Sequence, residues 1–317
     1  RYETAAIAQM LKQKPEVAKA VDYLRDHAAA DTAAYRIADA EHTPWLYVAK
    51  ALRRHDKDVV KLMSGSHADK MKAEAIAKLA NMQLPSGEFP WFSGMDGSRW
   101  MTVNVVSTLG EMMRLGVVRA DEKYVAQICQ KAIPYLDKQL AASLKEYNKC
   151  LAEAGKAGGK RDLLLDNMTL ELLHARLLMG TKVGADAQSL LDVLQKHWQY
   201  PSACDRITAS TILAQAGRTA EARLIVKSLE ENLVQTKDGT AFVAETGFLR
   251  RRALVEAQAM LIMTLQRLNH TSPNLPKLIN HLVLMKRGSD WPDAQSSSRA
   301  VLALLASQAK VEARDVV

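Results

Sequence analysis

The stretch that decides the fold is GEFPWFSGMDGSRWMTVNVV, which spans residues 87–106. Its first half brings together Gly, Pro and aromatic residues in a chain that is only 5% aromatic, and this mixture predicts an irregular loop. Its second half predicts a helix, because residues 103–113 carry apolar side chains at helical spacing. Asp96 or Ser98 is placed to cap the start of that helix, and Gly116 is placed to end it.

Helical patterns continue on both sides of this stretch. Ala and Leu are abundant, and both residue types favour helix. The periodicity predicts about a dozen helices joined by short connections. Pro134, within residues 124–154, is expected at a helix start or a kink. TKDGTAFVAETG, at residues 236–247, is the only place where we expect extended chain. The fold class is therefore all-α.

Two architectures suit such a chain, namely a closed α/α toroid and an open α-solenoid. A solenoid shows a repeat of about 34–47 residues, and no such repeat recurs here. We therefore favour the toroid, formed by a single domain over residues 1–317. Because the chain opens at Arg1 without an initiator Met or a signal peptide, we expect this domain to be excised from a larger multidomain protein.

Composition argues against several functions. The net charge is +8, but basic and acidic residues alternate, which is typical of a solvated helical surface rather than a nucleic-acid site. No apolar stretch approaches the roughly 20 residues that span a bilayer. The three cysteines, Cys129, Cys150 and Cys204, are too far apart for a disulfide framework or a zinc ribbon.

The stretch at residues 87–106 resembles a segment of the thioester-containing domain of alpha-2-macroglobulins. Trp91 lies inside it, and the matching positions are Gly87, Phe89, Phe92, Asp96, Ser98, Trp100, Thr102 and Val105. Three more landmarks follow the family's order. HTPWLYVAK contains Trp45, with His42 in place of the usual Glu. RALVEAQAMLIMTLQRL contains Glu256, Gln258 and Ala259, and MKRGSDWPDAQSSSRAVLALLA contains Trp291.

This resemblance implies a fold and a function. The family's domain is an α/α toroid of about six helical hairpins, and the landmark residues would serve its structure. The parent protein would be an endopeptidase inhibitor that encloses a protease after the protease cuts a bait region. Its partners would be proteases and neighbouring macroglobulin-type domains. The resemblance places it in the cell envelope, either periplasmic, membrane-anchored or secreted, with any membrane tether in regions outside this chain.

The chain departs from the family at the thioester itself. That bond joins a Cys to the Gln three residues later in a C-x-E-Q motif, and its acyl group is activated for attack by a nucleophile. The residues three positions after Cys129, Cys150 and Cys204 are Ala132, Glu153 and Ile207, respectively, and none of them is Gln. Residues 1–21 resemble the sequence that follows the motif in bacterial relatives. The chain as given cannot form a thioester, and we predict no cofactor.

Two other function classes remain as alternatives. A carbohydrate-active toroid enzyme would use Asp96 or Glu88 with Glu256, because glycoside hydrolysis needs paired carboxylates. A non-catalytic scaffold would only bind proteins. We favour a structural interpretation, in which buried aromatic side chains pin the loop and Asp96 or Ser98 bonds helix amides. Glu256 would then bond loop amides or an arginine such as Arg250 or Arg252, and no catalytic residue is predicted.

The histidines do not predict a metal site. His174 lies on a helix whose i+4 position is Leu178, so a second ligand is missing and a packed or hydrogen-bonded role is expected. His67, His270 and His281 also lack ligand spacing.

Overall fold

The computed structural model describes residues 65–156, 163–237, 239–244, 251–286 and 291–308. Trp45 and the helices expected before residue 65 lie outside these ranges. The chain divides into two compact units, Arg1–Leu79 and Ala80–Val317, and the contacts reported below lie within the second. The single domain over residues 1–317 stays a prediction, because most of the first unit is not described.

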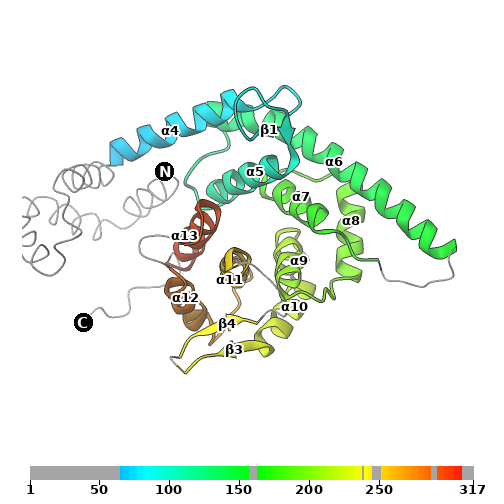
Figure 1. The fold of residues 1–317 in the computed structure, drawn as a ribbon, viewed down its shortest axis with the longest axis vertical. Helices are drawn as coiled ribbons and strands as arrows, with labels where there is room; N and C mark the ends of the chain where they lie inside the picture. Colours follow the sequence, from blue (N-terminus) through cyan, green and yellow to red (C-terminus); the bar gives the residue numbers. More distant parts are fainter. Residues whose placement is uncertain (1–64, 157–162, 238, 245–250, 287–290, 309–317) are drawn as a thin grey trace, which may run out of the picture. The chain divides into compact units, whose positions relative to one another are not determined.

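The described part of the chain is almost wholly helical, and the all-α prediction is confirmed (Figure 1). Its helices are α4 (Gly65–Met82), α5 (Arg99–Arg114), α6 (Lys123–Lys156), α7 (Asn167–Leu178), α8 (Ala185–Lys196), α9 (Ala203–Gln215), α10 (Thr219–Glu231), α11 (Arg251–Arg267), α12 (Leu275–Leu284) and α13 (Ala294–Gln308). Two short antiparallel hairpins complete it, β1 (Phe89–Pro90) with β2 (Gly97–Ser98) and β3 (Leu233–Gln235) with β4 (Ala241–Val243).

The odd-numbered helices form the inner part of the second unit. Along the series α5, α7, α9, α11 and α13 each helix packs on the next, and α13 also contacts α5. Four even-numbered helices pack on this inner set: α6 contacts α7, α8 contacts α9, α10 covers α9 and α12 covers α11. α6 and α8 also contact each other. Figure 1 shows α11 lying among α9, α12 and α13. The core therefore lies between alternating inner and outer helices.

Local sequence explains where the helices begin and end. The Ser98 side chain accepts a hydrogen bond from the Met101 amide and caps α5, as the sequence predicted. Asp166 caps α7 in the same way through the Thr169 amide. Gly116 follows α5 with a φ of 71°, a left-handed conformation that a side chain would disfavour.

Pro134 does not start a helix, because it lies inside the 34-residue helix α6. An internal proline costs about 3 kcal/mol through its missing amide and the clash of its ring. Burial on both sides of it offsets that cost: Ile128, Ala132, Leu136 and Leu140 are all 0% exposed. Packing of the helix face thus overrides the local preference.

Extended chain occurs at the predicted place and at one other. β4 lies within residues 236–247, and β3 directly precedes them. The expectation that this is the only extended segment is wrong, since β1 and β2 pair within the stretch expected to be irregular. Each of those strands has only two residues, too few to show the alternation that marks a strand in sequence.

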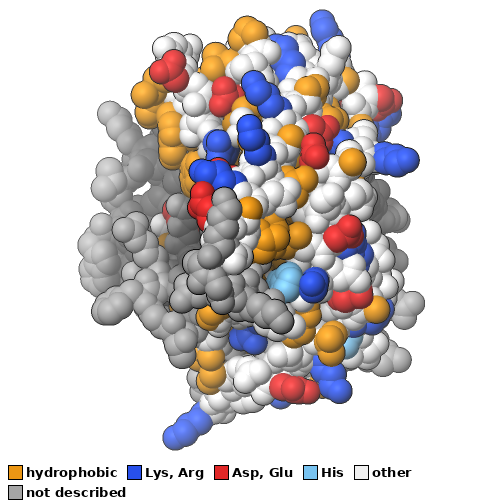
Figure 2. Space-filling view, turned by 90° about the vertical axis from the view of Figure 1, so that its right-hand side faces the viewer, with side chains coloured by type: hydrophobic (Ala, Val, Ile, Leu, Met, Phe, Trp, Pro, Cys, Tyr) orange, Lys and Arg blue, Asp and Glu red, His pale blue; other side chains and the backbone are white. Residues whose placement is uncertain are grey.

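Charged side chains of both signs share the surface. Figure 2 shows Lys and Arg side chains lying beside Asp and Glu side chains on the face drawn there. This mixture agrees with the sequence pattern of a solvated helical surface.

The close packing of α5 on α7 gives a test of the fold. A Cβ added at Gly110 would lie 2.5 Å from the Leu178 Cβ and 3.2 Å from the Leu178 carbonyl oxygen. We expect Gly110→Ala to lower the free energy of unfolding by about 1–3 kcal/mol, because the helices must move apart. Urea denaturation followed by circular dichroism measures this change.

Gly155→Ala is the matched control. It lies in α6, and an added Cβ would meet no atom within 4 Å. Its effect should be zero or a gain of up to about 1 kcal/mol from helix propensity. Equal effects of the two substitutions would contradict the packing of α5 on α7.

Candidate functional site

The segment at residues 87–100, here called the aromatic hairpin, is anchored at its base to α5. The Thr102 side chain is 0% exposed. Its hydroxyl donates to the Ser98 carbonyl at 2.8 Å and accepts from the Phe89 amide, also at 2.8 Å. One buried hydroxyl therefore joins both strands of the hairpin to the first turn of the helix.

A second anchor holds the base against α6. Gly87 has a φ of 95°, and a Cβ there would lie 2.3 Å from the Lys131 carbonyl oxygen. The Gln83 amide group donates to the carbonyls of Gly87 (3.1 Å) and Ile128 (3.2 Å). Phe89 is 1% exposed and completes the buried part. Only glycine permits this backbone approach, which explains its place in the stretch.

The rest of the aromatic hairpin is exposed. Nine large hydrophobic side chains of the described residues are exposed, and four of them, Trp91, Phe92, Met95 and Trp100, lie within ten residues of sequence. Phe92 is 70% exposed. The rings of Trp91 and Trp100 stack with 4.9 Å between centroids and 8° between planes. An exposed apolar cluster of this kind marks an interaction surface.

The interpretation that buried aromatics pin this loop is therefore only partly right. It holds for Phe89, which packs inward, and it is wrong for Trp91, Phe92 and Trp100. Asp96 is exposed and Ser98 alone caps α5, so of the two capping candidates the hydroxyl takes the role.

The carboxylates proposed for glycoside hydrolysis lie on different elements, Glu88 and Asp96 on the aromatic hairpin and Glu256 on α11. Asp96 lies at the exposed end of the hairpin. Glu88 accepts a hydrogen bond from the Ser86 hydroxyl at 3.1 Å. Burial, with the charge of Glu88 as a smaller cause, raises the pKa of Tyr135 to about 12. Glu256 lies on α11, with its Oε2 3.8 Å from Arg299 Nε. Arg299 on α13 is thus one arginine close to it; the side chains of Arg250 and Arg252 lie outside the described residues, and the prediction for them stays a prediction.

Gln258 and Trp291 hold the outer layer to the inner helices. The Gln258 amide group donates to the carbonyls of Ala241 and Leu278, each at 3.0 Å, and its oxygen accepts from the Val243 amide. The Trp291 indole donates to the Leu282 carbonyl at 2.9 Å. These hydrogen bonds join separate elements of the fold, and the side chains of Gln258 and Trp291 are both buried.

Buried ion pairs cross the inner helices, and the sequence analysis missed them. Glu111 on α5 accepts from Arg114 Nε at 2.6 Å and from Arg267 Nη2 on α11 at 3.3 Å. Burial raises the pKa of this carboxyl, but the charges of Arg114 and Arg267 outweigh burial and hold the pKa below its ordinary value. The available signal was a carboxylate inside the apolar stripe of α5, which requires a partner.

A second set of polar contacts joins α13 to α7 and α11. Arg299 on α13 lies 3.8 Å from Glu171 on α7 and from Glu256 on α11. His174 bonds Gln215 through its Nδ1 at 3.1 Å, so the hydrogen-bonded role predicted for it is confirmed. Burial lowers the pKa of His174 to about 4, and its imidazole is neutral near pH 7.

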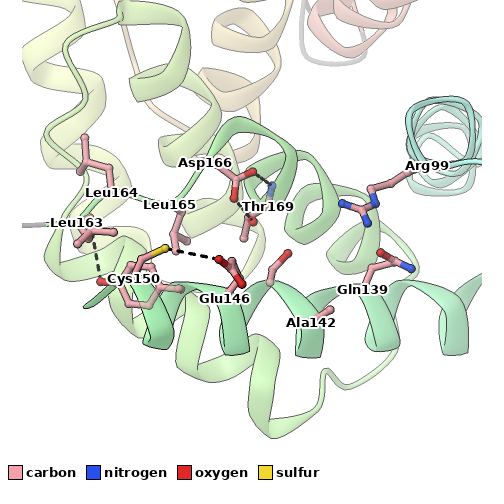
Figure 3. A pocket seen from close by; sticks show the side chains of 12 residues that line it. Arg99, Gln139, Ala142, Glu146, Cys150, Leu163, Leu164, Leu165, Asp166 and Thr169 are labelled. Carbon is pink, nitrogen blue, oxygen red and sulfur yellow. Dashed lines mark hydrogen bonds between the residues drawn. The ribbon is translucent and has the colours of Figure 1, made fainter. Parts of the chain in front are cut away.

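A cavity of about 390 Å³ lies between α6 and the start of α7 (Figure 3). Several of its polar groups serve the fold. The Asp166 carboxylate accepts from the Thr169 amide and hydroxyl at 2.9 and 2.8 Å. Tyr147 donates to the Leu163 carbonyl, and the Cys150 Sγ lies 3.8 Å from Glu146 Oε1. None of Glu88, Asp96 and Glu256 lines this cavity.

Comparison with known proteins places the chain in no family: no family model matches it, and no curated protein matches it. None of the helices in the described ranges combines the length and hydropathy that crossing a bilayer requires. Within those ranges no three His, Cys, Asp or Glu side chains gather so as to hold a metal ion.

The Thr102 hydroxyl predicts a measurable stability effect. Thr102→Val keeps the shape of the side chain but leaves the buried Phe89 amide without its acceptor. We expect the free energy of unfolding to fall by about 1–3 kcal/mol. Thr102→Ser, which keeps the hydroxyl, should lose less than half as much. Tryptophan fluorescence during urea denaturation measures both, and equal losses would contradict the anchoring role.

His174 predicts a pH dependence of stability. Because its pKa in the folded chain is about 4 and its ordinary value is 6.5, the unfolded chain binds more protons between these values. Stability is therefore full above about pH 6.5 and is lost as the pH falls towards 4, by up to roughly 3 kcal/mol. His174→Gln should flatten the unfolding free energy between pH 6.5 and 5. An unchanged slope in that variant would contradict a neutral, buried His174.

Proposed function

We propose that this chain is the toroid domain of a bacterial alpha-2-macroglobulin-like endopeptidase inhibitor, and that it acts by packing against other protein surfaces. The observation that carries the proposal is the aromatic hairpin. The segment with the family resemblance is also the segment with a fixed base and exposed apolar side chains. A domain that must dock on neighbours during protease capture needs such a surface.

The helix contacts support a closed ring rather than an open solenoid. In an open superhelix each helix contacts only its neighbours in the series. Here α5 contacts α13, and its Glu111 also pairs with Arg267 on α11. The Gln295 side chain on α13 donates to the Asn104 side chain on α5. These contacts between the first and last inner helices favour the toroid.

The mode of capture follows from the missing motif. None of Cys129, Cys150 and Cys204 is followed three residues later by Gln. This chain would therefore contribute to capture by steric packing, and any covalent step would need a C-x-E-Q motif outside it. The cell envelope, with proteases and macroglobulin-type domains as partners, follows from the resemblance and belongs to the same proposal.

A non-catalytic scaffold is the second candidate, since the same exposed hairpin would serve it. The two functions differ in what triggers binding. A trap holds its protease only after the bait region is cut, whereas a scaffold binds its partner at equilibrium without cleavage.

The test uses the full-length protein that contains this chain. After incubation with an endopeptidase such as trypsin, gel filtration should show the protease retained, while its activity on a small peptide substrate persists. Phe92→Ser should reduce the retained fraction at least several-fold, because hot-spot aromatics carry much of the energy of a protein interface. Retention by the full-length protein is measured from the activity of the eluted complex.

Leu224→Ser is the matched control, because Leu224 is 56% exposed on α10, away from the aromatic hairpin in sequence. It should leave retention unchanged. Failure of the cleaved full-length protein to retain protease would overturn the trap. Binding of protease without any cleavage would favour the scaffold.

A further inference from the structure

A second cavity, here called the end cavity, lies where four inner helices end. It has a volume of about 550 Å³ and is lined by the last residues of α5, α7, α9 and α11. Its walls include the apolar side chains of Met113, Leu177 and Met179, and its polar lining includes Arg114, Gln215 and Arg267. This volume lies within the range of small-molecule sites, and the lining has their usual composition.

The end cavity holds hydrogen-bond donors that the fold leaves unused. Arg267 donates from Nη2 to Glu111, but its buried Nη1 has no partner among the described residues. The Gln215 oxygen bonds His174, and its buried Nε2 likewise has none. An unpartnered buried donor costs about 1–3 kcal/mol, so two beside one cavity call for an explanation.

Arg114 adds an accessible donor at the same place. Its Nε bonds Glu111, while its side chain remains 31% exposed and lines the end cavity. The Nη1 and Nη2 atoms make no hydrogen bond within the described part of the chain. Such a free guanidinium edge matches the two oxygens of a carboxylate.

The side-chain acceptors that line the end cavity, by contrast, are already used: the Gln215 oxygen bonds His174, and the Thr181 hydroxyl accepts from Arg176 Nη1. A carbonyl near the end of each helix accepts a hydrogen bond from the backbone that follows: Glu111 from Leu115, Leu177 from Gly180, Leu213 from Arg218, and Leu265 from His270. What the lining side chains lack is therefore an acceptor.

The charges around the end cavity limit what that acceptor can be. Arg114 and Arg267 face one carboxylate, Glu111, which leaves one positive charge in excess. The cavity also lies at the negative ends of four helix dipoles, which oppose a dianion more than a monoanion. These charges favour a group with a single negative charge over a phosphate.

We infer that the end cavity binds a small organic monocarboxylate with an apolar body. Its carboxylate lies against the free edge of Arg114 and supplies the acceptor that Arg267 and Gln215 lack. Its apolar body lies on the walls formed by Met113, Leu177 and Met179. This site is separate in sequence from the aromatic hairpin and does not depend on the proposed function.

The experiment titrates the full chain with benzoate and, in parallel, with benzamide and inorganic phosphate, using isothermal titration calorimetry at about 50 mM salt. Benzoate should bind one to one with a Kd of about 1 mM or lower. Benzamide, which has the same ring without the charge, and phosphate, which has charge without the ring, should each bind at least tenfold more weakly. Equal binding of benzoate and benzamide, or no saturable binding of benzoate, overturns the proposal.

Two variants and a control localise the site. Arg114→Gln should weaken benzoate binding at least tenfold, and Arg114→Lys, which keeps the charge but not the planar fork, should recover part of it. Arg119→Gln removes the same charge from a side chain that is 74% exposed and does not line the cavity. It should leave the Kd within twofold. Equal weakening by Arg114→Gln and Arg119→Gln would show unspecific attraction and would overturn the site; circular dichroism checks that each variant is folded.

Discussion

The buried carboxylate of Glu111 is the constraint on which the inner helices depend. A charge that is 5% exposed is tolerated only where partners and hydrogen bonds replace water. Arg114 supplies one partner from the same helix, and Arg267 supplies the other from α11, distant in sequence. Removing Arg267 would leave a buried charge half compensated. The pairing therefore fixes how α5 and α11 lie relative to each other, and the similar contacts of Arg299 do so for α7, α11 and α13.

The same helix carries the two surfaces that could meet a partner. At the start of α5, Ser98 and Thr102 hold the aromatic hairpin. At its end, Glu111 and Arg114 belong to the end cavity or its border. Both surfaces are anchored to a helix that is buried along one face. A rigid base is what allows exposed aromatic rings to present a fixed shape, at a small cost in entropy on binding.

The local structure could be predicted from the sequence, whereas contacts between residues distant in the sequence could not. Helical spacing, the Ser98 cap and the stop at Gly116 were all predictable, because each depends on neighbours within one turn. The exposure of Trp91 and Phe92 was not, because an apolar residue is expected inside and only the hairpin geometry turns these two outward. The pairing of Glu111 with Arg267 joins residues 156 apart in sequence, and no pattern in a single sequence specifies such a partner. The unpartnered donors at the end cavity depend on such distant contacts, so they could not be predicted from the sequence either.

Several titratable groups in the described part of the chain hold its helices in place. A general acid or base must reach a substrate and exchange its proton near the working pH. His174 is buried and neutral, and it is held by Gln215. Glu111 and Asp166 are engaged by arginines and by a helix start. Each of these groups therefore stabilises the packing of helices. The exposed apolar rings of the aromatic hairpin and the donors of the end cavity are groups that would select a partner by shape and charge.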